Sequence, residues 1–273
     1  MADTSNRDYA REIARAAGGA ILFAFPLLMT MEMWRLGFHM DRFRLALFVA
    51  LGVVLLVGLS RRVGFQQNIR WRDDVCDALS AYAIGTLIAL AFLTLFGLLD
   101  RTMAPGEWVG KIAVQSVPAG IGAILARAQF TGAPDEEDAP PKGASYGGEL
   151  LLMIAGAVFV AFNVAPTDEI QVIAQQVSAW QAVLLALVSV TLLHLLVYNL
   201  GFSGQEAWPA NLSFLEVFFR FSLAGYGLAL TVSAYILWTF GRGDDAGLTQ
   251  LLTMTVVLGF PSSIGAATAR LIV

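Results

Sequence analysis

Eight long apolar runs, separated by shorter polar stretches, dominate the pattern of hydrophobic and polar positions along the chain. Each run approaches the roughly 20 residues that a helix needs to cross about 30 Å of hydrocarbon. Only helices and closed barrels satisfy their backbone groups in lipid, and these runs lack the alternation of a barrel strand. The pattern therefore predicts an all-α fold, a polytopic membrane helix bundle of about eight transmembrane helices. The expected spans cover about residues 16–33, 43–59, 75–99, 109–128, 150–166, 183–197, 214–240 and 248–272.

A polar stretch interrupts this pattern near the middle of the chain. Residues 129–148 contain the acidic run Asp135 to Asp138 between several prolines. Charge and proline forbid a buried helix there, so we expect this acidic linker to be solvated and cytoplasmic. It separates two expected four-helix units, residues 1–128 and 149–273.

The two expected units resemble each other in sequence. At an offset of 137 residues, six identities fall in the 14 positions from Gly19 to Glu32, among them a threonine and a glutamate. At an offset of 143, six of the ten residues from Pro118 to Arg127 recur between Pro261 and Arg270. We interpret this as an internal duplication. Because each copy has an even number of spans, both enter the membrane from the same side, related by an axis along the membrane normal.

Composition supports a membrane protein and excludes several other classes. The chain is 57% hydrophobic and only 14% charged, with a mean hydropathy of +0.68, whereas soluble domains carry about 25% charge. A pI near 5.2 and the absence of a basic patch argue against nucleic acid as a partner. The single cysteine excludes an internal disulfide and any multi-cysteine metal site. We expect no cofactor and no bound metal, and the lipid bilayer as the main partner.

The distribution of Lys and Arg predicts the orientation. With a cytoplasmic N-terminus, 11 of the 17 Lys and Arg residues fall on the inner side and six on the outer side. Cytoplasmic loops carry the excess of positive charge in membrane proteins. We therefore expect a multi-pass protein of the cell's inner membrane with both termini in the cytoplasm.

Glu32 and Glu169 are the leading candidates for chemistry. Each is expected at the end of the first helix of its copy, two residues after a threonine, Thr30 or Thr167. If the first helices meet near the pseudo-two-fold axis, the two carboxylates could bind a cation or share a proton, with the threonines as neutral oxygen ligands. The alternative is a pair of solvated helix ends near the outer boundary, where a charged residue costs little. Composition leaves both interpretations open.

The second copy carries further polar groups near this point. Asn163 precedes Pro166 and Asp168, and the segment resembles a helix break and restart. Broken helices at membrane depth free carbonyl groups for ions and substrates. The alternative is a plain helix end followed by an amphipathic outer segment, Ile170 to Trp180. In the first copy, Pro26 could kink the helix, but no proline follows it closely.

The repeated Pro-x-x-Ile-Gly-Ala-x-x-Ala-Arg motif predicts packing and anchoring. Its glycines permit close contact between helices, and its arginines fall near cytoplasmic helix ends. The residues concerned are Pro118, Gly122 and Arg127 in the first copy, and Pro261, Gly265 and Arg270 in the second.

Two polar residues lie inside predicted spans. His194 is expected in the sixth span, where a neutral histidine bonded to a neighbouring helix is the leading interpretation and a functional role the alternative. Arg220 lies early in the seventh span, where it can pair with Glu216 or extend to the headgroups.

Recognised catalytic motifs are absent from the sequence, which has no Walker loop, dinucleotide fingerprint, zinc-protease motif or nucleophile elbow. Three function classes remain. The first is a channel or transporter for a small cation or protons, the second a non-transporting accessory or sensory protein, and the third a lipid-handling membrane enzyme. A homo-oligomer is compatible with each of them.

The doubled Ala-Phe and Thr-x-Glu elements, with the segment from Ala165 to Ile170, resemble a bacterial family of uncharacterised integral membrane proteins. The resemblance covers nearly the whole chain. It implies a membrane location and two four-helix units, and it supplies no catalytic residues.

Overall fold

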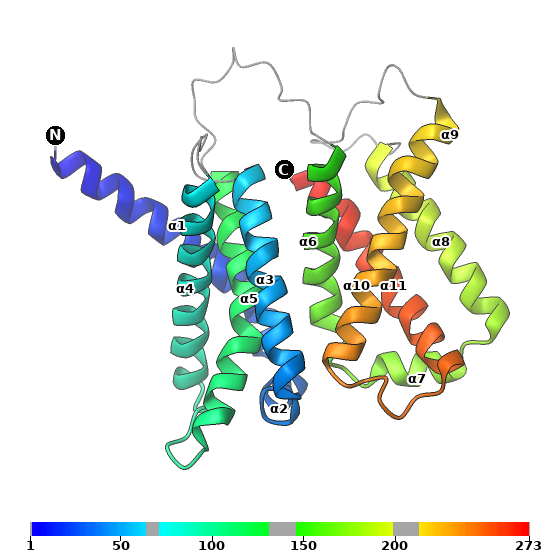
Figure 1. Ribbon diagram of the computed structural model, residues 1–273, viewed down its shortest axis with the longest axis horizontal. Coiled ribbons are helices and arrows are strands. Elements are labelled where there is room, and N and C mark those ends of the chain that lie inside the picture. The colour runs from blue at the N-terminus through cyan, green and yellow to red at the C-terminus, as the bar shows by residue number, and fades with distance from the viewer. Residues whose placement is uncertain (1, 64–70, 131–145, 199–212, 273) are drawn as a thin grey trace. The chain divides into compact units, whose positions relative to one another are not determined.

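The computed structural model describes residues 2–63, 71–130, 146–198 and 213–272 of the chain. Within these ranges every regular element is a helix, which confirms the all-α prediction. The chain divides into two compact units, Met1–Gly143 and Ala144–Val273 (Figure 1). Most of the acidic linker lies outside the described residues, but its two ends do not: Phe130 and Tyr146 belong to helices.

Unit 1 is built around its last helix. Its elements are α1 (Ala2–Leu28), α2 (Met31–His39), α3 (Arg42–Val63), α4 (Trp71–Leu95) and α5 (Pro105–Phe130). The other four helices all pack on α5. The most apolar window of α5 is 83% buried, whereas the corresponding windows of α3 and α4 are 28% buried and present leucines to the surroundings. Thus α5 forms the core of unit 1, and the outer helices expose much of their apolar surface.

Unit 2 has the same order of elements, except that α9, η1 and α10 together stand where unit 1 has the single helix α4. Its elements are α6 (Tyr146–Val164), α7 (Glu169–Gln176), α8 (Ala179–Tyr198), α9 (Phe214–Val217), η1 (Phe218–Leu223), α10 (Ala224–Thr239) and α11 (Leu248–Ile272). The last helix is again central, because α6, α7, α8 and α10 all pack on α11. The short helix α7 runs crosswise at one end of the unit (Figure 1).

Close contact at glycine holds the first and last helices of each unit together. A Cβ atom on Gly19 of α1 would overlap the carbonyl oxygen of Gly122 and the side chain of Ala126 in α5. In unit 2, a Cβ atom on Gly156 of α6 would overlap the carbonyl oxygen of Gly265 in α11 in the same way. In each unit, the glycine of the repeated motif thus lies where the backbones of the first and last helices come close together.

Seven helices in the described residues are long and apolar enough to cross a membrane, or eight if the bent pair α1 and α2 counts as one span. The first expected span, about residues 16–33, was wrong in one respect. The helix stops at Leu28, and α2 continues at 89° to it. Hydropathy predicted one continuous span here, because an apolar composition does not indicate where a helix changes direction.

A π-helical turn interrupts the seventh span. Residues Phe218–Leu223 form η1, which continues α9 and leads directly into α10. A π-helix places one extra residue in a turn and is frequent at functional sites. The sequence analysis did not foresee it, because its residues have the same apolar pattern as an α-helix.

Candidate functional site

The first helix of unit 1 ends at a threonine. Thr30 has an extended backbone with φ −100° and ψ 128°, and α2 begins immediately after it. Its backbone N–H and its hydroxyl both donate to the carbonyl oxygen of Leu27, at 3.2 and 3.0 Å. This carbonyl would otherwise lack a partner at the helix end, so the threonine stabilises the break.

The first helix of unit 2 ends in the same way. The backbone N–H and the hydroxyl of Thr167 donate to the carbonyl oxygen of Val164, at 3.1 and 2.8 Å. Pro166, which is buried, cannot donate to the helix, and α7 begins at Glu169. The side-chain amide of Asn163 donates to the carbonyl oxygen of Phe159 at 2.7 Å, so its NH₂ group is bonded to the backbone of its own helix, α6.

These breaks correct one expectation. Glu32 and Glu169 do not end the first helices: both lie in the first turn of the short helices that follow. Unit 1 breaks without a proline next to its threonine. Pro26 lies inside α1, and the Leu27 carbonyl at the break accepts a hydrogen bond from the Thr30 hydroxyl.

The environments of the acidic residues differ. Glu32 is half-buried and Glu169 is exposed, and within the described residues neither forms an ion pair. Asp168 pairs with Arg242 of the α10–α11 loop at 2.7 Å, and the side chain of Gln171 donates to the carbonyl oxygen of Arg242 at 3.3 Å. The sequence analysis missed this partner, because 74 residues separate Asp168 from Arg242.

The repeated proline motif lies in the two central helices. Pro118 is buried in α5, and Pro261 is half-buried in α11. Arg127 and Arg270 fall near the C-terminal ends of these helices, but their side chains lie outside the described residues. Their expected anchoring role therefore stays a prediction.

His194 contacts the π-helical turn. Its Nδ1 lies 2.7 Å from the hydroxyl oxygen of Ser222, a hydrogen bond between α8 and η1, and the His194 side chain is buried. The rings of Tyr198, Phe214 and Phe218 surround the imidazole at centroid distances of 5.2–5.6 Å. This hydrogen bond links α8 to η1, and the expectation that the imidazole is neutral stays a prediction.

Arg220 is exposed at the same end of unit 2. Its guanidinium lies 5.0 Å from the centroid of the Tyr146 ring, and the Tyr146 hydroxyl donates to its carbonyl oxygen at 2.8 Å. The carboxylate of Glu216 accepts hydrogen bonds from Ser213, with which it forms a capping box. Arg220 thus ties α6 to η1.

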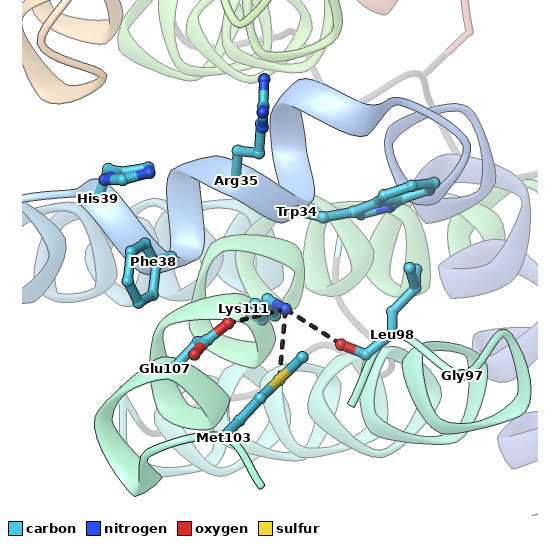
Figure 2. A pocket seen from close by; sticks show the side chains of 9 residues that line it. All are labelled: Trp34, Arg35, Phe38, His39, Gly97, Leu98, Met103, Glu107 and Lys111. Atoms are coloured by element: carbon cyan, nitrogen blue, oxygen red, sulfur yellow. Dashed lines mark hydrogen bonds and ion pairs between the residues drawn. The ribbon is translucent and has the colours of Figure 1, made fainter. Parts of the chain in front are cut away.

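A pocket of about 560 Å³ lies within unit 1, between α2 and the start of α5 (Figure 2). Helix α2 contributes Trp34, Arg35, Phe38 and His39 to its wall. The remaining wall comes from the α4–α5 connection and from α5. The sequence analysis did not single out this region, although a tryptophan, an arginine and a histidine within six residues were a visible signal.

Lys111 lies in the wall of this pocket. Its side chain is 9% exposed, and its Nζ lies 3.1 Å from the carboxylate of Glu107, one turn earlier on α5. The same ammonium donates to the carbonyl oxygen of Leu98 at 3.1 Å and to the sulfur of Met103 at 3.5 Å (Figure 2). The Leu98 carbonyl follows a Schellman turn at Gly97, whose φ of +69° favours glycine.

The crossing of α2 and α5 explains why the lysine is buried. A Cβ atom on Gly37 would lie 2.6 Å from the backbone of Lys111, and one on Gly110 would overlap the carbonyl oxygen of Gly37. The two backbones therefore touch. The side chain of Lys111 must run out beneath α2, toward the α4–α5 connection.

Comparison with known proteins gives one match. The family described as "Putative integral membrane protein (DUF2391)" matches residues 12–273. The chain belongs to this family. The match confirms the resemblance drawn from the doubled Ala-Phe and Thr-x-Glu elements and the membrane location that it implied. No curated protein and no solved structure matches the chain.

Proposed function

We propose that this integral membrane protein is a channel or transporter for a small cation or protons, with Glu32 and Glu169 forming a carboxylate site at the interface of its two units. The observation that carries the proposal is the helix break that occurs in both units, each time at a threonine and just before a glutamate. Broken helices with free polar groups are typical of ion sites at membrane depth.

The breaks meet a geometric requirement of such a site. On a straight helix, residues two apart point about 200° away from each other, so a threonine and the second residue after it could not share a ligand. An extended Thr30 in unit 1 and the Val164–Glu169 gap in unit 2 remove this restriction. Each hydroxyl uses its proton on a carbonyl, which leaves its oxygen lone pairs available to a cation.

The charges favour a hard cation or a proton. Within the described residues, neither carboxylate is neutralised by an ion pair, although each lies at the positive end of a short helix. Two carboxylates brought together would raise one another's affinity for a proton, and carboxylate with hydroxyl oxygen suits hard cations.

We further propose that the units are duplicated copies related by an axis along the membrane normal, with both termini cytoplasmic. The order of packed helices supports the duplication, because the last helix is central in each unit and receives the first helix at a glycine contact. Under this arrangement Glu32 and Glu169 would be equivalent residues on opposite sides of the axis.

Flux through liposomes tests the proposal. Purified full-length protein should conduct monovalent or divalent cations, or protons, and Glu32→Gln with Glu169→Gln should abolish the flux. Asp41→Asn is a matched control, since it removes one carboxylate while Asn still accepts the N-cap bonds that Phe43 and Arg44 donate. Unchanged flux in the double variant, or none in the wild type, would refute the proposal.

A second candidate, a lipid-handling protein without transport, is favoured by the pocket beside Lys111. Wild-type protein that retains lipid but conducts nothing would select it. A stable complex with another membrane protein, again without flux, would instead select an accessory or sensory role.

A further inference from the structure

A charged lysine is unusual at a position as buried as that of Lys111. Removing a charged ammonium from water costs several kcal/mol, and a neighbouring carboxylate repays this only in part. One of the three acceptors of Lys111 is the thioether of Met103, which accepts hydrogen bonds weakly. An oxygen from a ligand would be a better third partner.

Unit 2 shows that the fold does not need this charge. At the offset of 143 that aligns the proline motifs, Gln250 and Met254 stand where unit 1 has Glu107 and Lys111. Met254 is fully buried in α11. In α11, which is also the central helix of its unit, an apolar methionine thus occupies the position that aligns with Lys111. Replacing a buried ion pair by apolar residues is often neutral or stabilising. Stability alone does not account for the pair in unit 1.

We propose that the pocket beside Lys111 binds a phosphate ester that carries a net negative charge. Arg35 and Lys111 supply two positive charges to its wall and Glu107 supplies one negative charge, which leaves one positive charge for a ligand. The volume of about 560 Å³ lies in the range of about 300–1,000 Å³ that is usual for ligand pockets.

The donors suit a phosphate group. An ammonium acts as a point charge and a guanidinium as a planar fork, so together they can engage several oxygens of one phosphate from different directions. Lys111 is held in place by Glu107 and Leu98. Arg35 is exposed and has no ion-pair partner within the described residues. It points away from the ammonium in Figure 2, so the proposal requires its side chain to rotate inward when the ligand binds.

The phosphate group can belong to a membrane lipid or to a soluble molecule. Trp34 and Phe38 line the pocket from a short helix that turns by 89° at the end of α1. Trp is enriched at the level of lipid headgroups, and Trp34 therefore favours entry of an anionic phospholipid from the membrane. A soluble phosphate ester can enter from water. Both present the same chemistry to Lys111 and Arg35.

Binding to purified full-length protein tests the proposal. Native mass spectrometry would compare retention of phosphatidylglycerol with that of phosphatidylcholine of the same chain length, and calorimetry would measure glycerol 3-phosphate. Lys111→Met, which installs the residue of unit 2, and Arg35→Gln should each weaken binding about tenfold or more, because each removes a charge-assisted bond. Arg101→Gln is the matched control, since it removes an exposed arginine of the α4–α5 connection that does not line the pocket.

The outcomes separate the sources and can overturn the proposal. Selective retention of phosphatidylglycerol, lost in the Arg35 and Lys111 variants and kept in the Arg101 variant, supports a lipid headgroup. Binding of glycerol 3-phosphate with the same dependence, without lipid selectivity, supports a soluble ester. Should Lys111→Met fail to fold, Arg35→Gln decides alone. Equal retention of both lipids with no binding of the ester, or equal losses in all three variants, would overturn the proposal. None of these readouts depends on cation flux.

Discussion

Two adjacent glycines of α1 offer a direct test of how the first and last helices of unit 1 meet. A Cβ atom on Gly19 would overlap the carbonyl oxygen of Gly122 and the Cβ of Ala126 in α5. For Gly18, one residue earlier on the same helix, no described atom of another helix lies within 4 Å of such a Cβ. We predict that Gly19→Ala destabilises the protein relative to Gly18→Ala.

The paired design isolates the steric cost. Both substitutions gain the same helix propensity, roughly 1 kcal/mol in favour of Ala, so this contribution cancels in the difference. The atoms that Gly19→Ala would meet are backbone and a single methyl group, and neither can rotate away. Helices α1 and α5 must then move apart, and overpacking of this kind costs about 1–3 kcal/mol.

Thermal unfolding in one detergent measures this difference. At roughly 2–4 °C per kcal/mol for a chain of this size, Gly19→Ala should melt about 2–12 °C below Gly18→Ala. Gly156→Ala, in the equivalent contact of unit 2, should behave like Gly19→Ala. Equal melting temperatures for the Gly18 and Gly19 variants would show that α1 and α5 do not touch at this glycine.

Three further predictions concern other parts of the chain. A double-mutant cycle on Asp168 and Arg242 should give a coupling of about 1 kcal/mol or less by thermal unfolding, because the carboxylate is 77% exposed. Ser222→Ala should cost about 1–3 kcal/mol in the same assay, because it removes a buried partner of His194, whereas Thr231→Val, which alters an exposed hydroxyl on α10, should cost little. Protease added to sealed right-side-out vesicles should leave the acidic linker intact, and cleavage there would reverse the expected topology.

Hydropathy predicted the helical elements well, because transfer into lipid depends on the sum over a whole segment rather than on any one residue. Helix ends follow different rules. The break before Glu169 was visible in the sequence, since Pro166 cannot continue a helix. The break at Thr30 was not, because it rests on one hydroxyl bonded to the carbonyl of Leu27, an interaction that many mid-helix threonines also make.

The features that depend on tertiary contact could not be predicted. In the sequence, Lys111 is one of the six Lys and Arg residues that the expected topology puts on the outer side of the membrane. Its burial follows from the contact between Gly37 and Gly110. The partner of Asp168 lies 74 residues away. The π-helical turn has the apolar composition of any span, and only the bond between Ser222 and His194 shows which way it faces.

The central position of the last helix has a consequence for biosynthesis. Because α5 contacts all four preceding helices of its unit, the earlier helices enter the membrane before their common partner exists. The ribosome must release Pro105–Phe130 before unit 1 can close, and Leu248–Ile272 before unit 2 can close. Unit 1 can therefore complete its packing while unit 2 is still being made. A nascent chain that stops short of α5 or α11 leaves a half-assembled bundle, whose polar groups within the bilayer would mark it for quality control.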